Sequence, residues 1–192
     1  MSYSDFKTLD QVNKNLGIVI KAENELYVNV EPVEVTQWFI DTMKMAYTRA
    51  IRINTESARQ ALIVDLMLIE LNQHVSISFF LENSFNVDSS KGLTGNPDGI
   101  ISHSDNQLYI TSPVVVLASA KKSDLGSGLA QCLAEMEAAR IFNEKEGNNI
   151  PTLYGVVTDG ALWQFLSLKD NIATIDSYLY HLGAVTLLRQ RS

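Results

Sequence analysis

The chain has little of several features that mark particular classes of protein. Its single cysteine, Cys132, excludes an internal disulfide and suits a reducing compartment. No apolar run approaches the length of a membrane span. The opening residues, MSYSDFKTLD, have neither the basic nor the apolar region of a signal peptide. These absences predict a cytoplasmic protein without a membrane partner. Cys132 lies in a helical pattern and is interpreted as a small core residue.

Basic residues are also scarce: 15 Lys and Arg stand against 22 Asp and Glu, for a net charge of −7. Binding to nucleic acid depends mainly on Lys and Arg that neutralise phosphates, so this balance weighs against DNA as a partner. It does not exclude DNA, because a metal ion can screen an acidic site. A hydrophobic content of 46% over 192 residues predicts one globular domain spanning residues 1–192.

Patterns in the first half of the chain predict helices more clearly than strands. Residues 1–15 are polar and mixed and are expected to be a loosely held lead-in, and residues 16–30 suggest a hairpin that turns at Glu23 and Asn24. Apolar spacing predicts a helix over 35–50. Asn54 or Thr55 would cap a second helix, which runs to about residue 72.

Strand-like runs dominate the second half. Pro113 is unusual inside a strand and predicts a bulge or an interrupted ladder. A helix is expected to start near Gly126 and Gly128. The predicted elements are a strand within 75–88, a strand starting at Pro97-Asp98, a turn at 104–106, a strand over 108–120, a helix to residue 143, a strand over 153–158, a turn at Asp159-Gly160, a strand over 161–168 and a short helix near 183–189.

An acid and a lysine stand at corresponding places on two neighbouring strands. Asp98 begins one strand, and Lys121 lies near the end of the next. Residues i and i+2 of a strand share a face, so Ser119 and Lys121 are expected to project together beside Asp98. Carboxylates bind Mg²⁺, and a lysine can orient water and stabilise charge on a phosphate. Taken alone, the sequence GNPDG around Asp98 is also a good turn.

The order of these motifs resembles the PD-(D/E)XK nuclease superfamily, and in particular the N-terminal nuclease domain of type I restriction subunits. The matching segments are ESARQALIVDLM, GNPDGII, VVVLASAKK, GLAQCLAEMEAARIFN and LYGVVTDGALWQFLSL, which cover residues 55–168. The resemblance implies an α/β (α+β) restriction-endonuclease-like fold, with a central mixed sheet flanked by helices. It also implies a Mg²⁺ ligand at Asp98, catalytic roles for Lys121, Gln131 and Glu56, and DNA as substrate.

Ser119 departs from this pattern, because the family has Asp or Glu at that position. A neutral hydroxyl removes one negative charge, so Mg²⁺ is expected to bind weakly. The leading hypothesis is therefore a degenerate, non-cleaving site on a binding or assembly module, which could form a homodimer. One alternative is an active Mg²⁺-dependent DNA endonuclease in which another acid substitutes. A third is a structural interaction protein that only retains the fold.

Several other acids are candidates to replace the carboxylate that is missing at position 119. Glu56 resembles the acid that many family members carry on the preceding helix, although a glutamate in a first helical turn is equally explained by the helix dipole. Glu70 is a weaker candidate for the same role. Glu82 and Glu135 are the other candidates, and Glu135 shares a helix face with Gln131, four residues earlier.

Overall fold

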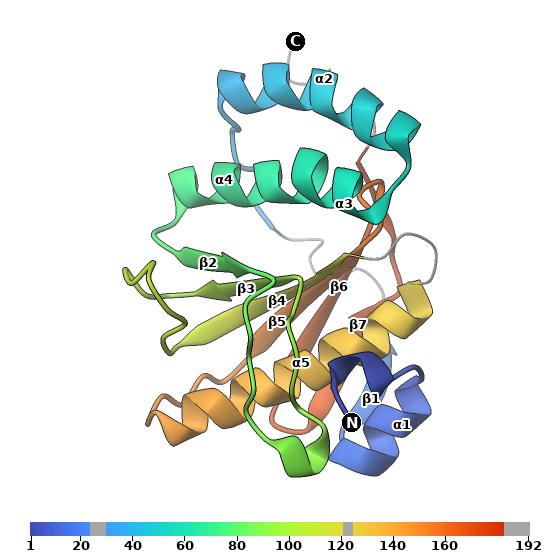
Figure 1. Ribbon diagram of the computed structural model, residues 1–192, viewed down its shortest axis with the longest axis vertical. Helices are drawn as coiled ribbons and strands as arrows, with labels where there is room; N and C mark the ends of the chain where they lie inside the picture. Colours follow the sequence, from blue (N-terminus) through green and yellow to red (C-terminus); the bar gives the residue numbers. More distant parts are fainter. Residues whose placement is uncertain (24–29, 121–124, 183–192) are drawn as a thin grey trace.

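The computed structural model describes residues 1–23, 30–120 and 125–182, with the backbone alone for 117–120. Helices cover both faces of a mixed eight-stranded sheet, in the order β1-β7-β6-β5-β4-β3-β2, with β8 paired to β6 (Figure 1). The strands are β1 (Val19–Glu23), β2 (Ser78–Leu81), β3 (Gly99–Ser102), β4 (Val114–Ala120), β5 (Leu153–Thr158), β6 (Leu162–Lys169), β7 (Ile172–Asp176) and β8 (Tyr180–His181).

The helices divide between the two faces of the sheet. α5 and α1 lie on one face, and the layer made of α2, α3 and α4 lies on the other (Figure 1). No helix within the described ranges is long and apolar enough to cross a membrane. The helical elements are η1 (Tyr3–Asp5), α1 (Leu9–Leu16), α2 (Gln37–Ile53), α3 (Glu56–Arg59), the π-helical turn η2 (Gln60–Val64), α4 (Asp65–His74), η3 (Ser89–Lys91) and α5 (Leu125–Lys145).

Strands β2, β3 and β4 form an antiparallel meander, and α5 then crosses over to β5, which runs parallel to β4. Ile101 pairs with Val116 whereas Ser102 pairs with Val114, so one extra residue of β4 is accommodated between these pairs. This irregularity lies directly after Pro113, which confirms the interruption predicted there. The antiparallel and parallel strands together give the mixed α/β architecture expected from the sequence.

Helix α5 is buried along most of its length because the sheet covers one side and the N-terminal elements η1 and α1 cover another. Cys132 is fully buried, which confirms its interpretation as a core residue. The helix packs closely over Gly155 of β5. A Cβ atom added at Gly155 would lie 2.6 Å from Sδ of Met136 and 2.9 Å from Sγ of Cys132. Glycine at this position therefore permits the close approach of helix and strand.

The opposite face of the sheet packs on α4 through a smaller core of Leu68, Ile77 and Ile101. The helices predicted over 35–50 and up to residue 72 correspond to α2 and to the continuous α3–η2–α4 segment. Thr55 caps α3 by accepting a hydrogen bond from the Ala58 amide, so the cap is Thr55 and not Asn54.

One prediction for the N-terminal region is wrong. Residues 1–15 form η1 and α1, and they bury Tyr3, Phe6 and Val12 in the main core. β1 pairs in parallel with β7, a strand that was not predicted. The hairpin predicted over 16–30 stays a prediction, because residues 24–29 lie outside the described residues.

Two predicted strands are shorter than expected. The strand expected over 108–120 begins only at Val114, and the strand expected within 75–88 is limited to Ser78–Leu81. Residues 103–113 instead form a loop that hydrogen bonds hold in place, including one from Oγ of Thr111 to Oγ of Ser104. The helix predicted near 183–189 lies outside the described residues.

Candidate functional site

Asp98 lies where the end of β2, the start of β3 and the carboxyl end of β4 are side by side. Leu81 ends β2 and pairs with Gly99, which begins β3 and pairs in turn with Ala118 of β4. One step beyond the Gly99–Ala118 pair, the antiparallel register sets Asp98 opposite position 119. The Glu82 amide donates to the Asp98 carbonyl at 3.4 Å, which holds the end of β2 against this point.

Asp98 is half-buried and follows the buried Pro97. The structure therefore brings Asp98 and the backbone of Ser119 together, as the hairpin pattern predicts. The side chain of Ser119 and the whole of Lys121 lie outside what the structure describes, so the predicted roles of these residues stay predictions. The backbone of Ser119 also pairs with Val157 of β5, which places position 119 between two strands near the carboxyl end of β4.

Gln131 and Glu135 form a polar pair on α5. Nε2 of Gln131 donates to Oε1 of Glu135 at 2.8 Å, and Glu135 is fully buried while Gln131 is half-buried. The two residues thus share a helix face, as their spacing predicts. A buried carboxylate is costly unless other groups stabilise its charge, so buried acids gather at functional sites more often than elsewhere.

Tyr3 connects Glu135 to the loop that leads into β3. The Tyr3 hydroxyl donates to the Phe85 carbonyl at 2.5 Å, and a Cβ atom added at Gly95 would lie 3.1 Å from the Tyr3 ring. Burial, and secondly the negative charge of Glu135, raise the pKa of the Tyr3 phenol far above its usual value. The hydroxyl therefore stays protonated and remains a donor over the whole working pH range.

Glu56 occupies the first turn of α3 and is exposed. Its helix is attached to the residue that follows β5, because Arg59 donates through Nη1 to the Asp159 carbonyl and forms an ion pair of 3.5 Å with the Asp159 carboxylate. Asp159 follows Thr158, which pairs with Ala120 at the end of β4. The catalytic role predicted for Glu56 stays a prediction, and its position is also the one that favours a glutamate by the helix dipole.

Asp65, which the sequence did not single out, lies close to Glu82. Burial raises the pKa of Asp65, a hydrogen bond of 2.7 Å from Gln60 lowers it, and the nearby charge of Glu82 raises it again, with a net upward shift. Glu82 itself is exposed and has a left-handed backbone, with φ of 50°. No spacing rule links these two acids, because Asp65 begins α4 and Glu82 follows β2.

Glu70 is buried and forms hydrogen bonds with Thr36 and His74. It is only 4% exposed and accepts hydrogen bonds from the amide and the hydroxyl of Thr36, both at 2.6 Å, and shares one of 3.0 Å with His74. Thr36 is the N-cap residue of α2, so Glu70 fixes the start of α2 against α4. Burial alone would raise the pKa of Glu70, but the hydrogen bonds from Thr36 and His74 outweigh it and hold the pKa below its usual range.

Replacing Glu70 with Gln is expected to lower the free energy of unfolding by about 2 kcal/mol at pH 7, because the hydrogen bonds to a charged acceptor are lost. Since the pKa of Glu70 is lower in the folded state, its stabilising effect is complete above the unfolded-state pKa and is lost as the pH falls through the folded-state value. Urea unfolding at several pH values should therefore show the gap between the two proteins narrowing below about pH 4.

The matched control for this change is Glu146→Gln, which alters an exposed glutamate and should stay within about 0.5 kcal/mol of the parent. A gap between the parent and the Glu70→Gln protein that stays constant from pH 7 to pH 3 would contradict the assigned role of Glu70.

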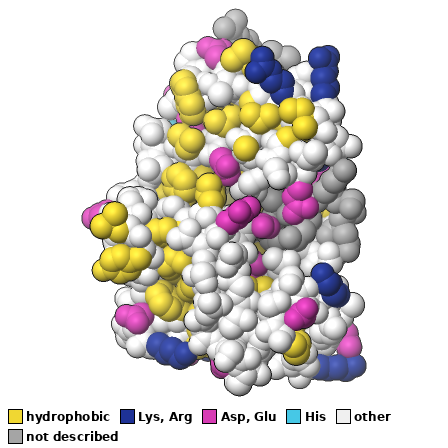
Figure 2. Space-filling model, in the orientation of Figure 1, with side chains coloured by type: hydrophobic (Ala, Val, Ile, Leu, Met, Phe, Trp, Pro, Cys, Tyr) yellow, Lys and Arg dark blue, Asp and Glu magenta, His cyan; other side chains and the backbone are white. Residues whose placement is uncertain are grey.

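Acidic side chains gather near the middle of one face of the molecule, below the helical layer, whereas the described Lys and Arg side chains on this face lie at its margins (Figure 2). A DNA backbone approaching the middle of this face would meet negative charge first. Within the described ranges, no group of three or more His, Cys, Asp or Glu residues is arranged to hold a metal ion. The role of Asp98 as a Mg²⁺ ligand therefore stays a prediction.

Comparison with known proteins adds no family assignment, since neither protein-family models nor curated sequences give a match to this chain.

Proposed function

We propose that this chain is a PD-(D/E)XK-like protein with a degenerate metal site, and that it acts as a binding or assembly module. The order of elements supports this proposal: a helix, three antiparallel strands, a crossover helix and a parallel strand. These elements form a mixed sheet with helices on both faces, which is the architecture that the resemblance implies. The observation that carries the proposal is the register in which Gly99 pairs with Ala118, so that Asp98 stands opposite position 119.

The chemistry at this position explains the expected loss of cleavage. With serine at position 119, Mg²⁺ would be held by the Asp98 carboxylate, backbone carbonyl oxygens and water. Hard divalent cations bind more tightly as carboxylate ligands are added. A site with one carboxylate fewer is expected to fill only at high Mg²⁺ concentration. Among the described side chains in Figure 2, acidic groups occupy the middle of the face and Lys and Arg lie only at its margins, which weighs against DNA as a partner. A second copy of the chain is the partner that we expect first.

The substitution Ser119→Glu tests the proposal directly. The variant is expected to bind Mn²⁺ at least tenfold more tightly than the parent, because a second carboxylate joins the site. Isothermal titration with Mn²⁺ measures the affinity, and a plasmid-nicking assay measures cleavage. The parent is expected to leave the plasmid intact. Ser177→Glu is the matched control, because Ser177 is exposed and follows β7, three strands from β4 in the sheet.

A second candidate function is an active Mg²⁺-dependent DNA endonuclease in which another carboxylate replaces the missing acid. The burial of Glu135 and its hydrogen bond to Gln131 favour this residue as the replacement. Glu56 and Glu82 are exposed, and Glu70 is already bound to Thr36, the N-cap residue of α2. If the parent protein nicks plasmid DNA and both Asp98→Ala and Glu135→Gln abolish nicking, this second function replaces the first.

A further inference from the structure

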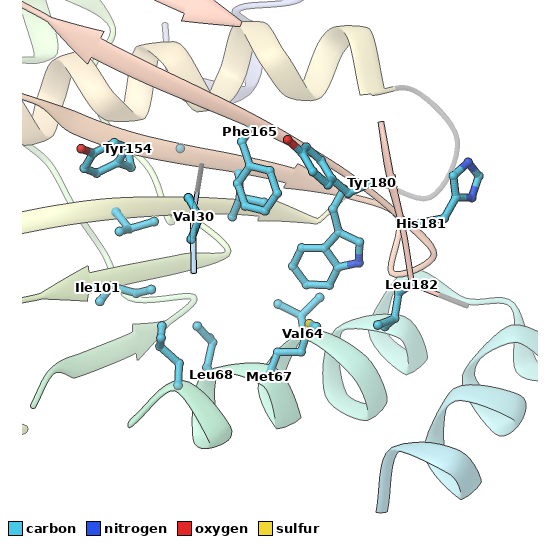
Figure 3. A pocket seen from close by; sticks show the side chains of 15 residues that line it. Val30, Val64, Met67, Leu68, Ile101, Tyr154, Phe165, Tyr180, His181 and Leu182 are labelled. Carbon is cyan, nitrogen blue, oxygen red and sulfur yellow. The ribbon is translucent and has the colours of Figure 1, made fainter. Parts of the chain in front are cut away.

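Helix α2 is the outermost element of the layer that covers the sheet opposite α5. Figure 3 shows Val64, Met67 and Leu68 pointing from η2 and α4 toward the sheet, so the layer rests on the sheet through these two elements. α2 packs on the other side of η2, α3 and α4 (Figure 1). One side of α2 is therefore buried within its own layer, and the other side is exposed.

The exposed side of α2 carries a stripe of five residues. They are Trp38, Asp41, Met45, Arg49 and Arg52. Neighbours in the stripe are three or four residues apart, so they lie along one face of the helix. Trp38 is 49% exposed and Met45 is 62% exposed. A single exposed apolar residue is common on protein surfaces, so the order of residues within the stripe matters more than either exposure.

The stripe is symmetric in position about Met45 and complementary in charge. Asp41 and Arg49 lie four residues before and after Met45, and Trp38 and Arg52 lie seven residues before and after it. Two α2 helices that cross antiparallel about a two-fold axis at Met45 would set each Asp41 opposite Arg49 of the second copy. Each Trp38 would lie opposite Arg52 of the second copy. Opposite charges attract, and an Arg guanidinium binds favourably over the face of a Trp ring. A parallel pair would instead set like charges against each other.

The charged residues of the stripe have weak partners or none within the part of the chain that the structure describes. Asp41 forms an ion pair of 3.7 Å with Lys44, and both side chains are exposed, so this pair contributes little. No hydrogen bond or ion pair joins Arg49 or Arg52 to another described residue. Both guanidinium groups are therefore available to an acidic or aromatic group of a second molecule.

We propose that a second copy of the chain binds to this stripe, with the two α2 helices antiparallel about a two-fold axis at Met45. Trp, Met and Arg supply four of the five residues of the stripe, and these residue types are enriched in protein interfaces. The proposal names the surface by which the proposed assembly module pairs, and in that respect it rests on the proposed function. It involves neither Asp98 nor position 119, so dimer formation and metal binding are tested separately.

Analytical ultracentrifugation of the full chain over a range of concentrations measures dimer formation. The parent is expected to form a dimer in a concentration-dependent way. Met45→Glu sets two like charges at the axis and should weaken the dimer by at least about tenfold. Leu108→Glu is the matched control, because Leu108 is 90% exposed in the loop before β4 and should leave the dissociation constant unchanged. Circular dichroism and thermal unfolding establish that each variant is folded.

A charge exchange tests the pairing itself. Asp41→Arg and Arg49→Asp each set like charges opposite one another, and each should weaken the dimer by at least about tenfold. The double variant Asp41→Arg/Arg49→Asp restores opposite charges across the axis, and it should recover the parent dissociation constant to within about threefold. Because residues 41 and 49 are about 12 Å apart along one helix, no contact within a single chain can produce this recovery.

A parent protein that remains monomeric at about 1 mM overturns the proposal, whereas the Mn²⁺ titration of Ser119→Glu still decides the metal-site proposal. A parent dimer that Met45→Glu leaves unchanged also overturns it, because the two copies would then meet through another surface. A double variant that dimerises as weakly as the two single variants would refute the antiparallel pairing of Asp41 with Arg49.

Discussion

Replacing Tyr3 with Ala is expected to lower the free energy of unfolding by about 3 to 5 kcal/mol, the largest effect we predict for a single substitution. Tyr3 is only 2% exposed, and its ring lies in the main core that α5 shares with the sheet. Its removal leaves a cavity beside α5 and also deletes the hydrogen bond to the Phe85 carbonyl. Urea denaturation followed by circular dichroism measures the change.

Tyr3→Phe separates the two contributions, because it keeps the ring and removes only the hydroxyl. We expect a loss of about 1 kcal/mol for this variant. Tyr109→Ala is the control for a tyrosine outside the core, since Tyr109 is 64% exposed and its removal should cost less than about 0.5 kcal/mol. A loss below about 1 kcal/mol for Tyr3→Ala would mean that the N-terminal segment does not support the core as the structure indicates.

Tyr3 also supports the loop before β3, which leads to the candidate site. The Tyr3 amide donates to the Thr94 carbonyl at 3.0 Å, and its ring packs on Gly95. Three residues later the chain reaches Asp98. Loss of Tyr3 should therefore loosen the segment that positions Asp98, so the Ser119→Glu variant should lose much of its gained Mn²⁺ affinity when it is combined with Tyr3→Ala.

Local sequence patterns predicted those elements whose formation depends on their own residues. The long helix α5 follows from apolar spacing, and the strand β5 follows from a continuous apolar run. The sequence also predicts a cap at Asn54 or Thr55, and the structure shows that it is Thr55. The neighbouring positions of Asp98 and Ser119 follow from hairpin pairing between consecutive strands. These features need only short-range information, which a single sequence contains.

Features that depend on distant partners could not be predicted in this way. β1 pairs in parallel with β7, from the other end of the described chain, so no local pattern predicts this pairing. The sequence makes Glu70 a weak candidate for the missing acid, yet its position is explained by its hydrogen bonds with Thr36, thirty-four residues earlier. The effect of the Glu82 charge on the pKa of Asp65 is a third case, because a helix and a strand must pack before the two acids come near each other.

The irregular pairing next to Pro113 was predicted, but the residue that holds the start of β4 in place was not. Asn143, near the end of α5, is 1% exposed. Its Oδ1 accepts from the Val114 amide at 2.8 Å and its Nδ2 donates to the Val114 carbonyl at 2.7 Å. Oδ1 also accepts from the Ser112 hydroxyl at 3.0 Å. One side chain thus satisfies both the amide and the carbonyl of Val114, the first residue of β4.

Replacing Asn143 with Ala is therefore expected to lower the free energy of unfolding by about 3 kcal/mol, because the buried amide and carbonyl of Val114 lose their partners together. Asn143→Asp keeps an acceptor for the amide but sets a negative oxygen against the carbonyl, so it should be no more stable than Asn143→Ala. Asn148→Ala is the control, since its single side-chain bond to Ser112 is half-buried and should cost about 1 kcal/mol or less. Equal losses for Asn143→Ala and Asn148→Ala in urea denaturation would show that the bulge does not depend on Asn143. A larger loss for Asn143→Ala would mean that α5 holds the start of the strand whose other end carries Ser119.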